Sequence, residues 1–357
     1  MGSKPVIAID INKGKRGGPY ISSMNLMNSS LKEDFNFVPI YYDNGLGRFI
    51  SIKRIKDIVK QIKKASPDGI LITGLQLSGF HVALASLISG VRTRIVIIRG
   101  SSTEAISFPF IKRICIGILE YLTLGMSTAF YGVSNYASQL SAAPRFRKKN
   151  RGYVYNIPCI NMPTSPFAKR ELGLDESDIL ISTSGRITKE KGFEVLLHTI
   201  KKISDPKIKF IIIGDGEYLT EMKKAIKTIQ RENSVIFTGY TSRVMDYIYA
   251  SDIFVLPTLH ETLSVSLLEA ASLSKPLISC NVGGVPEIIE NNVNGLLVSP
   301  SQPSELAEAI LKLSNNERMR SKFGKAAKKT VDTKFAKDKL INQVRDILNC
   351  ELGNEKN

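Results

Sequence analysis

Two glutamates, Glu261 and Glu269, stand eight positions apart in the stretch H-E-T-L-S-V-S-L-L-E-A. The apolar run 253–256 precedes them and ends at Pro257. We expect a strand, then a loop that carries Glu261, then a helix that opens near Ser264. A carboxylate accepts hydrogen bonds from two hydroxyls, as a diol offers them. Glu269 is therefore a candidate for a ribose diol, and Glu261 for sugar hydroxyls or for orienting a reacting group. The alternative is one loop glutamate and one glutamate on a helix surface.

The start of that expected helix is a candidate anion site. Ser264, Val265 and Ser266 open the helix. The first amides of a helix have no partner inside it and lie at the positive end of its dipole. We expect these amides to point at a negatively charged group.

A second loop carries two cations in the sequence S-G-R-I-T-K-E-K-G-F-E, residues 184–194. A strand is expected to end at Ser184 and a helix to begin near Gly192. Arg186 and Lys191 would then both lie in the loop at the end of a strand. An arginine binds a diphosphate as a two-pronged donor, and a lysine binds it as a mobile point charge. The alternative is that both are solvated charges of a surface loop.

Glycines follow three further expected strands. Gly17 and Gly18 precede a helix, and a glycine turn before a helix is an anion site in principle. The stretch G-D-G at 214–216 lacks the third glycine of a dinucleotide fingerprint. Gly239 and Tyr240 follow another strand and either face a base or form a plain turn. Each of these motifs is weak by itself, and a turn accounts for each of them equally well.

Short apolar runs alternate with helix-like segments along the whole chain, which favours two doubly wound α/β domains with parallel sheets facing each other across a cleft. Ligands of such sheets bind at the carboxyl ends of the strands. Expected strands are 5–9, 36–41, 69–73, 94–98, 129–133, 152–156, 179–184, 208–213, 234–237, 252–256, 276–279 and 295–298. Expected helices are 18–31, 51–64, 79–89, 107–124, 134–141, 191–202, 217–230, 242–249, 264–273, 284–290, 302–314, 316–333 and 335–351.

The expected domains are 1–163, 164–334 and a C-terminal helix, 335–357, that packs back on the first domain. A cluster of Pro158, Pro163 and Pro166 marks the first boundary. The chain has 357 residues, which is too long for one ordinary core. No secretory signal and no spanning segment is evident, and four scattered cysteines indicate a reducing, cytoplasmic setting.

The charge of the chain is uneven. Residues 1–160 hold 22 Lys and Arg against 8 Asp and Glu, whereas residues 161–357 hold 27 against 25. The first half is therefore expected to meet an anionic partner, unless its lysines are only solvated helix faces. Basic residues gather in 53–64 and 145–151, and we expect them to hold the protein at an anionic membrane surface. Nucleic acid is not expected as a partner, because aromatic residues do not alternate with these basic runs.

Taken together, these residues resemble the retaining glycosyltransferases of family 4, which have the two-domain GT-B fold. The resemblance rests on R-x4-K-G, G-D-G, F-x-G-Y and E-x7-E, and on the segments 275–289 and 294–298, Ser134 and the stretch 154–156. It implies that the first domain binds the acceptor and the second a nucleotide-sugar donor. It places Arg186 and Lys191 at the donor diphosphate, Glu269 at the ribose and Glu261 at the donor sugar. The donor-binding residues that it implies are Gly17, Gly18, Arg186, Lys191, Gly239, Tyr240, Leu263, Ser264, Val265 and Glu269.

The sequence departs from the family pattern in two places. The glycines within the family's E-G-F-G segment are replaced here by Thr262 and Ser264. The histidine that many members carry after the fourth strand is replaced by the segment from Arg99 to Ser102, so Arg99 and Ser101 become candidates on the acceptor side. His81, on the preceding helix, is not assigned that role.

The resemblance implies metal-independent transfer of a sugar, with retention, to a glycan acceptor that is lipid-linked, in surface polysaccharide assembly at the inner face of the cell membrane. No metal site and no cofactor is expected beyond the nucleotide-sugar, with a UDP-sugar favoured and a GDP-sugar as the alternative. Other readings are a synthase or phosphorylase of the same fold, a nucleotide-sugar epimerase, and a basic protein that only binds anionic surfaces.

Overall fold

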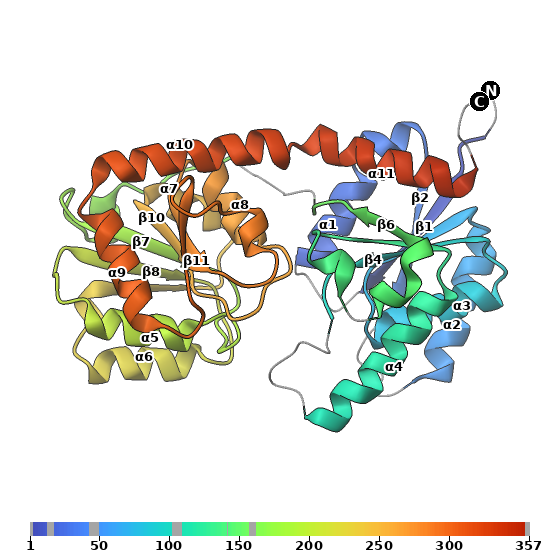
Figure 1. The fold of residues 1–357 in the computed structure, drawn as a ribbon, viewed down its shortest axis with the longest axis horizontal. Helices are drawn as coiled ribbons and strands as arrows, with labels where there is room; N and C mark the ends of the chain where they lie inside the picture. The colour runs from blue at the N-terminus through green and yellow to red at the C-terminus, as the bar shows by residue number, and fades with distance from the viewer. Residues whose placement is uncertain are drawn as a thin grey trace. The chain divides into compact units, whose positions relative to one another are not determined.

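A computed structural model describes residues 3–12, 18–42, 50–101, 109–140, 142–156 and 162–353. The chain divides into two compact units (Figure 1). The first unit comprises Met1–Cys159 together with Ala336–Asn357, and the second comprises Ile160–Phe335. Each unit contains its own six-stranded parallel sheet.

The sheet of the first unit has the strand order β2-β1-β3-β4-β5-β6. Its central strands are buried runs rich in isoleucine and valine, as strands covered on both faces require. The order reverses between β1 and β3, because β2 lies on one side of β1 and all later strands lie on the other. The strands are β1 Val6–Asn12, β2 Asn36–Tyr42, β3 Gly69–Ile72, β4 Thr93–Ile98, β5 Ala129–Gly132 and β6 Asn150–Tyr153.

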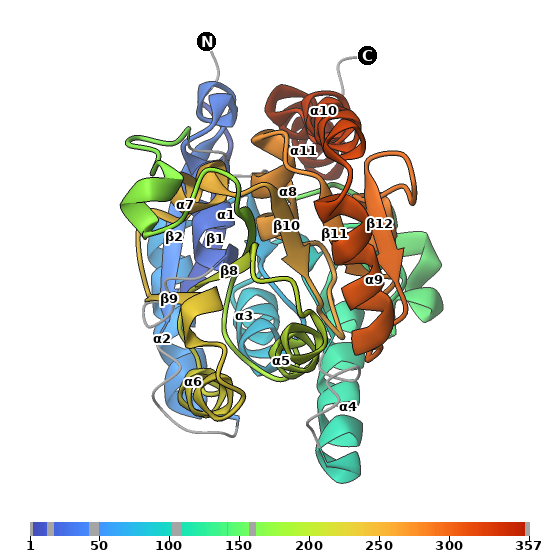
Figure 2. The same ribbon diagram turned by 90° about the vertical axis from the view of Figure 1, so that its left-hand side faces the viewer.

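Helices cover both faces of this sheet (Figures 1 and 2). On one face, α3 packs against both α2 and α4. On the other lie α1 and α11, and α11 is tied to the unit by Arg345 Nε, 2.8 Å from Asp34, and by Arg151 Nε, 2.5 Å from Glu351. The helices are α1 Gly18–Met27, α2 Ile52–Ala65, α3 Leu77–Ile88, α4 Phe110–Met126 and α11 Lys337–Leu352, with 3-10 turns η1 Ser30–Glu33, η3 Ala137–Gln139 and η4 Ala143–Lys149.

The sheet of the second unit has the order β12-β11-β10-β7-β8-β9. Here the order reverses between β7 and β10, since β8 and β9 extend the sheet on one side of β7 and the later strands extend it on the other. The strands are β7 Ile179–Ser184, β8 Ile208–Ile213, β9 Val235–Gly239, β10 Ile253–Leu256, β11 Leu277–Cys280 and β12 Gly295–Val298.

Two helical layers enclose the second sheet (Figure 2). In one layer α5 packs against α6 and α9, and in the other α8 packs against α7 and α10. An apolar cluster between the sheet and the first layer forms the core of this unit. The helices are α5 Phe193–Lys202, α6 Leu219–Thr228, α7 Val244–Ala250, α8 Val265–Ser272, α9 Pro303–Ser314 and α10 Glu317–Lys334, with 3-10 turns η5 Lys169–Leu172, η6 Glu232–Ser234 and η7 Val285–Glu287.

The predicted fold class is confirmed, with two corrections to the predicted helices. For the helices predicted at 134–141 and 284–290, the structure has the short 3-10 turns η3 within the described residues 134–140 and η7 within 284–290. In the first, the Ser134 hydroxyl accepts the amide of Ala137 and closes a tight turn. In the second, the turn covers only Val285–Glu287, and the amide of its C-cap residue Ile288 donates to the carbonyl of Val285. The strand predicted at 152–156 is also displaced, because β6 ends at Tyr153. Within the described residues, no helix is long and apolar enough to cross a membrane.

Candidate active site

The point where the strand order of the second sheet reverses lies between β7 and β10. These strands are hydrogen-bonded neighbours, and the chain leaves them towards opposite sides of the sheet. The loops that follow these strands, 185–192 and 257–264, therefore diverge at the carboxyl edge of the sheet. Such a reversal is where parallel sheets bind ligands. Arg186 and Lys191 lie in the first loop, and Glu261 lies in the second.

A close backbone contact locks these two loops together. The amide of Leu259 donates to the carbonyl of Glu190 at 3.0 Å. Gly192 has φ +74°, and a Cβ there would lie 1.7 Å from the carbonyl oxygen of Pro257. Only glycine satisfies both the left-handed backbone and this approach. Gly192 therefore fixes the position of the residue before it, Lys191, against the second loop.

Lys191 and Glu261 form an ion pair at this locked junction. The Nζ of Lys191 lies 2.5 Å from Oε2 of Glu261, with the lysine side chain 25% exposed and the glutamate 11%. The carbonyl of Glu261 also accepts the amide of Gly284 at 3.0 Å. A nearly buried carboxylate requires a compensating charge, and Lys191 supplies it while remaining open to solvent on one side. The structure thus brings together two of the three predicted catalytic residues.

The third predicted catalytic residue, Arg186, is exposed on the same loop. Its neighbours are fixed by backbone hydrogen bonds, from the amide of Gly185 to Ile213 at 3.0 Å and from that of Ile187 to Asp215 at 2.9 Å. The structure assigns a packing role to the G-D-G motif at 214–216. A Cβ on its first glycine would lie 2.0 Å from the carbonyl of Gly185, and one on its second glycine 2.3 Å from that of Ile187.

The start of α8 has the capping arrangement expected of a helix that offers amides to a ligand. The hydroxyl of Ser264 accepts the amide of Leu267 at 3.3 Å and lies 3.1 Å from the hydroxyl of Ser266. This cap occupies the amide of the third helical residue. The earlier amides, of Val265 and Ser266, have no carbonyl partner inside the helix. Leu263 is buried just before the cap and holds the loop against the core.

Glu269 lies in the second turn of α8, where its carboxyl group is largely removed from water. This desolvation raises the pKa of Glu269 to about 7. The group therefore changes charge near neutral pH. Two hydroxyl donors would favour its charged form and lower the pKa again.

Gly239 is the last residue of β9, which is two strands away from β7, and Tyr240 follows it. Gly239 has φ +66°, and its carbonyl accepts the amide of Gly214 at 3.0 Å. The side chain of Tyr240 is 83% exposed. An exposed aromatic ring is suited to stack on a planar base, but the structure places no other predicted residue against it.

In the first unit, the predicted glycine pair begins outside the described residues. Gly17 is not described, and Gly18 is the first residue of α1. At the reversal of this sheet, Asp10 on β1 is buried and accepts the amide of Thr73 at 2.5 Å. Burial raises the pKa of Asp10, and the hydrogen bonds of Thr73 and the charge of Arg99 oppose that rise.

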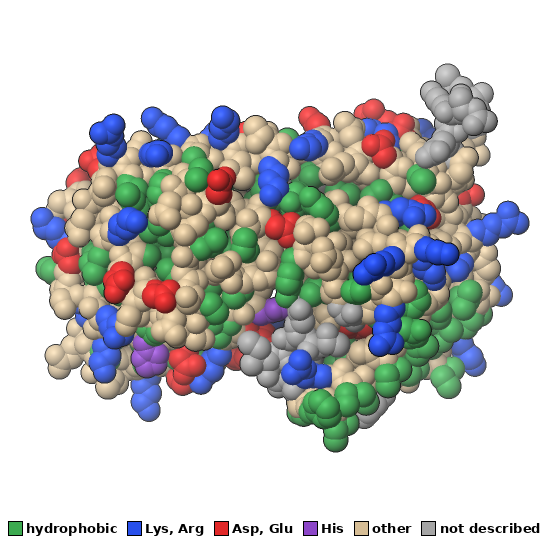
Figure 3. All heavy atoms as spheres, in the orientation of Figure 1, with side chains coloured by type: hydrophobic (Ala, Val, Ile, Leu, Met, Phe, Trp, Pro, Cys, Tyr) green, Lys and Arg blue, Asp and Glu red, His purple; other side chains and the backbone are tan. Residues whose placement is uncertain are grey.

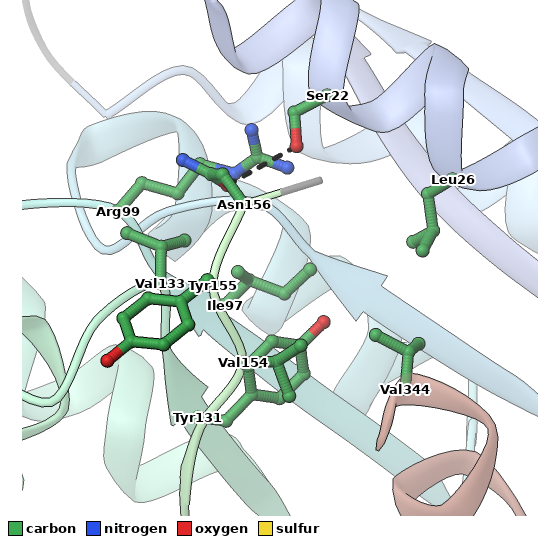
Figure 4. Close-up of a pocket in the computed structure, with 10 residues that line it drawn as sticks. All are labelled: Ser22, Leu26, Ile97, Arg99, Tyr131, Val133, Val154, Tyr155, Asn156 and Val344. Atoms are coloured by element: carbon green, nitrogen blue, oxygen red, sulfur yellow. Dashed lines mark hydrogen bonds between the residues drawn. The ribbon is translucent and has the colours of Figure 1, made fainter. Parts of the chain in front are cut away.

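Arg99, predicted on the acceptor side, borders a hollow at the carboxyl end of β4 (Figure 4). One of its guanidinium nitrogens lies 3.3 Å from the hydroxyl of Ser23. The hydroxyl of Ser22 donates to Asn156 at 3.3 Å across the same hollow. The hollow encloses about 300 Å³, open solvent included, and is lined by Ser22, Leu26, Ile97, Arg99, Tyr131, Val133, Val154, Tyr155, Asn156 and Val344.

Ser101, the other residue predicted on the acceptor side, faces the interior. It is 5% exposed, and its hydroxyl donates to the buried carboxylate of Glu120 on α4 at 2.7 Å. This contact ties α4 to the end of β4, so Ser101 has a structural partner in this structure. His81 is also buried, and its Nε2 accepts the amide of Ser51.

The groups that could hold a phosphate are thus the two cations of loop 185–192 and the first amides of α8. Among the residues that the structure describes, no three His, Cys, Asp or Glu side chains converge as metal ligands.

Two positioning residues were missed from the sequence. The sequence pattern predicts Gly192 only as the start of a helix and predicts no role for Gly284. A glycine directly after a candidate cation, and the Gly283-Gly284 pair after β11, were the available signals, because both positions allow backbone to approach backbone closely.

The strand-order reversal of the second sheet thus carries two cations on one loop, a desolvated carboxyl group and a helix start, at the edge where doubly wound α/β proteins bind ligands. Residues 164–330 match the family model of the glycosyl transferases group 1. N-acetyl-alpha-D-glucosaminyl L-malate synthase of Bacillus anthracis is 26% identical over 53% of this chain and 50% of its own length. The alignment thus spans half of that relative.

Two longer matches cover both units. The capsular polysaccharide biosynthesis glycosyltransferase CapM of Staphylococcus aureus is 24% identical over 87% of each chain. The solved structure of Alr3699/HepE of Anabaena, in complex with UDP and glucose, has a TM-score of 0.81 and 18% identity, covering 97% of this chain and all of that one. The fold is therefore of the GT-B type, and residues 164–330, just under half of the chain, are similar to the glycosyl transferases group 1.

Proposed function

We propose that the protein is a retaining, metal-independent glycosyltransferase. It transfers a sugar from a nucleoside-diphosphate sugar to a glycan acceptor. The observation that carries this proposal is the ion pair between Lys191 and Glu261 at the reversal of the second sheet, with Arg186 on the same loop. The family of residues 164–330 and the names of the relatives support the same reaction class.

The leaving diphosphate sets the electrostatic requirement of this reaction. Negative charge develops on the leaving oxygen as the glycosidic bond breaks, and fixed cations that meet it lower the barrier. Lys191 and Arg186 provide these cations, and the amides of Val265 and Ser266 provide further donors. Lys191 has a second task, because its charge also keeps the carboxylate of Glu261 compatible with a nearby diphosphate. Glu261 then holds hydroxyls of the donor sugar.

For the donor we favour a UDP-sugar, with a GDP-sugar as the alternative. Alr3699/HepE is described in complex with UDP and glucose, which supports the first choice. Glu269 would accept both ribose hydroxyls in its charged form, and the ring of Tyr240 would lie beside the base. Gly17 and Gly18 would close over the phosphates.

The acceptor is proposed to be a lipid-linked glycan in the assembly of a surface polysaccharide, reached at the inner face of the cell membrane. CapM is named for capsular polysaccharide biosynthesis, which supports this pathway class. In the first unit, exposed lysines of α2 and the segment 145–151 give the positive surface that an anionic membrane attracts. Arg99 and the hollow beside it are proposed for the acceptor side.

A panel of nucleotide-sugars, assayed with and without a chelator, tests this function. We expect release of one nucleoside diphosphate, unaffected by the chelator, with transfer to a lipid-linked glycan in preference to free sugars. NMR of the product should show the anomeric configuration of the donor. Turnover of no donor, or inversion at the anomeric carbon, would overturn the corresponding part of the proposal.

A further inference from the structure

The helix α4 of the first unit leaves an apolar face exposed. Its buried residues are Glu120, Thr123 and Leu124, of which two are polar. A surface helix normally buries an apolar stripe and exposes its polar side. The exposed large hydrophobic residues of α4 are Phe110, Ile111, Ile114, Ile118, Tyr121 and Leu122, with exposures from 43% to 76%.

These residues form one continuous stripe. They recur at spacings of three or four positions, which places them on one side of a helix. Phe110 and Ile111 are the most exposed, at 75% and 76%. Figure 3 shows hydrophobic side chains gathered at the lower end of α4 in that view. A monomeric soluble protein rarely leaves such a stripe uncovered, so it indicates an apolar partner.

The inner side of α4 is fixed firmly enough to present the stripe. Glu120 is fully buried and bonds Ser101 at the end of β4. Further along the helix, at its C-terminal end, Nζ of Lys149 donates to the carbonyls of Leu124, Gly125 and Ser127 at 2.7–3.2 Å. The stripe is therefore held facing outwards.

The residues beside the stripe are basic. The ring of Tyr121 packs on that of Phe146 in η4, with 5.0 Å between centroids. The same turn carries Arg145, Arg147 and Lys148, all exposed. Across α4 and η4 the single acidic residue is Glu120, which is buried. The surface thus joins an apolar stripe to a cluster of cations with no exposed anion in either element.

We propose that α4 inserts its apolar stripe into the surface of an anionic lipid bilayer, while the cations of η4 contact the headgroups. An interfacial helix combines these two features, lying in the membrane plane with its apolar side below the headgroups. A second copy of the chain fits less well, because a two-fold interface would bring the basic clusters of both copies together. The inference names the membrane-contacting element within the proposed function and rests on it for the lipid-linked acceptor.

The chain contains no tryptophan, so a single introduced one reports on its own surroundings. Ile118→Trp places the reporter in the stripe, and Tyr249→Trp is the matched control in the second unit, with 55% and 51% exposure of the native side chains. We expect the emission of Ile118→Trp to shift to the blue on vesicles of phosphatidylcholine with phosphatidylglycerol, and to be quenched by brominated acyl chains. The control should show neither change.

The double variant Ile114→Ser, Ile118→Ser tests whether the stripe carries the binding. We expect its co-flotation with the same vesicles to fall by at least about tenfold, because two exposed side chains no longer enter the apolar layer. Pure phosphatidylcholine vesicles or about 0.5 M salt should also weaken binding of the wild type. The melting temperature of the double variant, and its shift with UDP, should equal those of the wild type. Both residues are exposed, and both lie outside the second unit.

Three results would overturn the inference. They are wild-type protein that does not float with anionic vesicles at low salt, a double variant that floats as well as the wild type, and an Ile118→Trp emission that shifts with protein concentration in the absence of lipid. The last result would identify a second copy as the partner. Failure of the glycosyltransferase proposal would appear separately, as a missing UDP shift or missing turnover.

Discussion

At the scale of single residues, the pairing of Lys191 with Glu261 explains why a carboxylate stands in an otherwise apolar stretch. Glu261 is tolerated in a nearly buried position because its neighbour loop brings a cation within 2.5 Å. The ion pair in turn holds the side chain of Lys191 in one position. The pair is therefore suited to meet a ligand that carries both negative charge and hydroxyl groups.

Replacing Lys191 with alanine should lower the rate of donor turnover by about 10²–10³-fold, by analogy with the loss of one donor to a developing anion. The matched control is Lys189→Ala. Lys189 lies two residues away, 56% exposed, with solvent-exposed partners in Glu194 and Glu221, and its loss should change the rate by less than about threefold. Steady-state kinetics on both variants decide the assignment. Equal losses in the two would contradict it.

The raised pKa of Glu269 gives a pH-dependent stability. A carboxyl group whose folded pKa lies above its unfolded value favours folding when protonated, so its contribution is complete below about pH 4.5 and is lost as the pH rises through about 7. Glu269→Gln should therefore gain stability relative to the wild type between pH 5 and pH 8, by roughly 1–3 kcal/mol. Denaturant titrations at the two pH values measure this. A pH-independent difference would show that the group does not titrate there.

The same group should couple pH to donor binding. If a ribose diol binds the charged form, UDP affinity should rise by up to about tenfold from about pH 6 to about pH 8. Calorimetric titration of wild type and Glu269→Gln separates this effect from the titration of UDP itself, which both proteins share. If UDP affinity depended on pH in the same way in both proteins, Glu269 would not bind the ribose.

At the scale of elements, close contacts between loops position the site. Gly192→Ala should destabilise the second unit by more than about 3 kcal/mol, because the new Cβ meets the carbonyl of Pro257 and the backbone is left-handed. Gly173→Ala is the matched control, with φ +72° and no atom within 4 Å of its Cβ. It should cost only about 1–2 kcal/mol. Thermal melts of the two variants should differ clearly, and similar melts would show that the loop relaxes around the methyl group.

Most elements of both sheets were predictable from the sequence, because fully buried parallel strands are unbroken apolar runs such as 208–213. The glutamates and cations were also found by type and spacing. Their pairing was not, since it depends on β10 returning beside β7 across the strand-order reversal. The packing role of the G-D-G motif was missed for a similar reason, because its contacts are made by backbone from another strand. The apolar pattern of 106–131 suits a buried helix and an interfacial helix alike, because a sequence pattern does not tell which side of a helix faces the core.

At the scale of the whole molecule, the chain returns to its first unit after completing its second. The buried residues of α11 are Leu340, Ile341, Val344 and Leu348. Truncation after Phe335 should therefore unfold or strongly destabilise the first unit, at roughly 1.5–3 kcal/mol for each lost apolar side chain. Truncation after Gly353 should be neutral. Calorimetry of both forms tests this, and a first unit that melts normally without α11 would contradict the division into units.

The central claim is that loops 185–192 and 257–264 of the second unit bind a nucleoside diphosphate. The most direct measurement is a thermal titration of the wild type, Lys191→Ala and Lys189→Ala with UDP and GDP in a chelator. A ligand that binds only the folded state raises the melting temperature by mass action. The account predicts a selective rise with one nucleotide, retained in Lys189→Ala and lost in Lys191→Ala. A well-folded wild type that shows no rise with either nucleotide, or an equal rise in all three proteins, would contradict it.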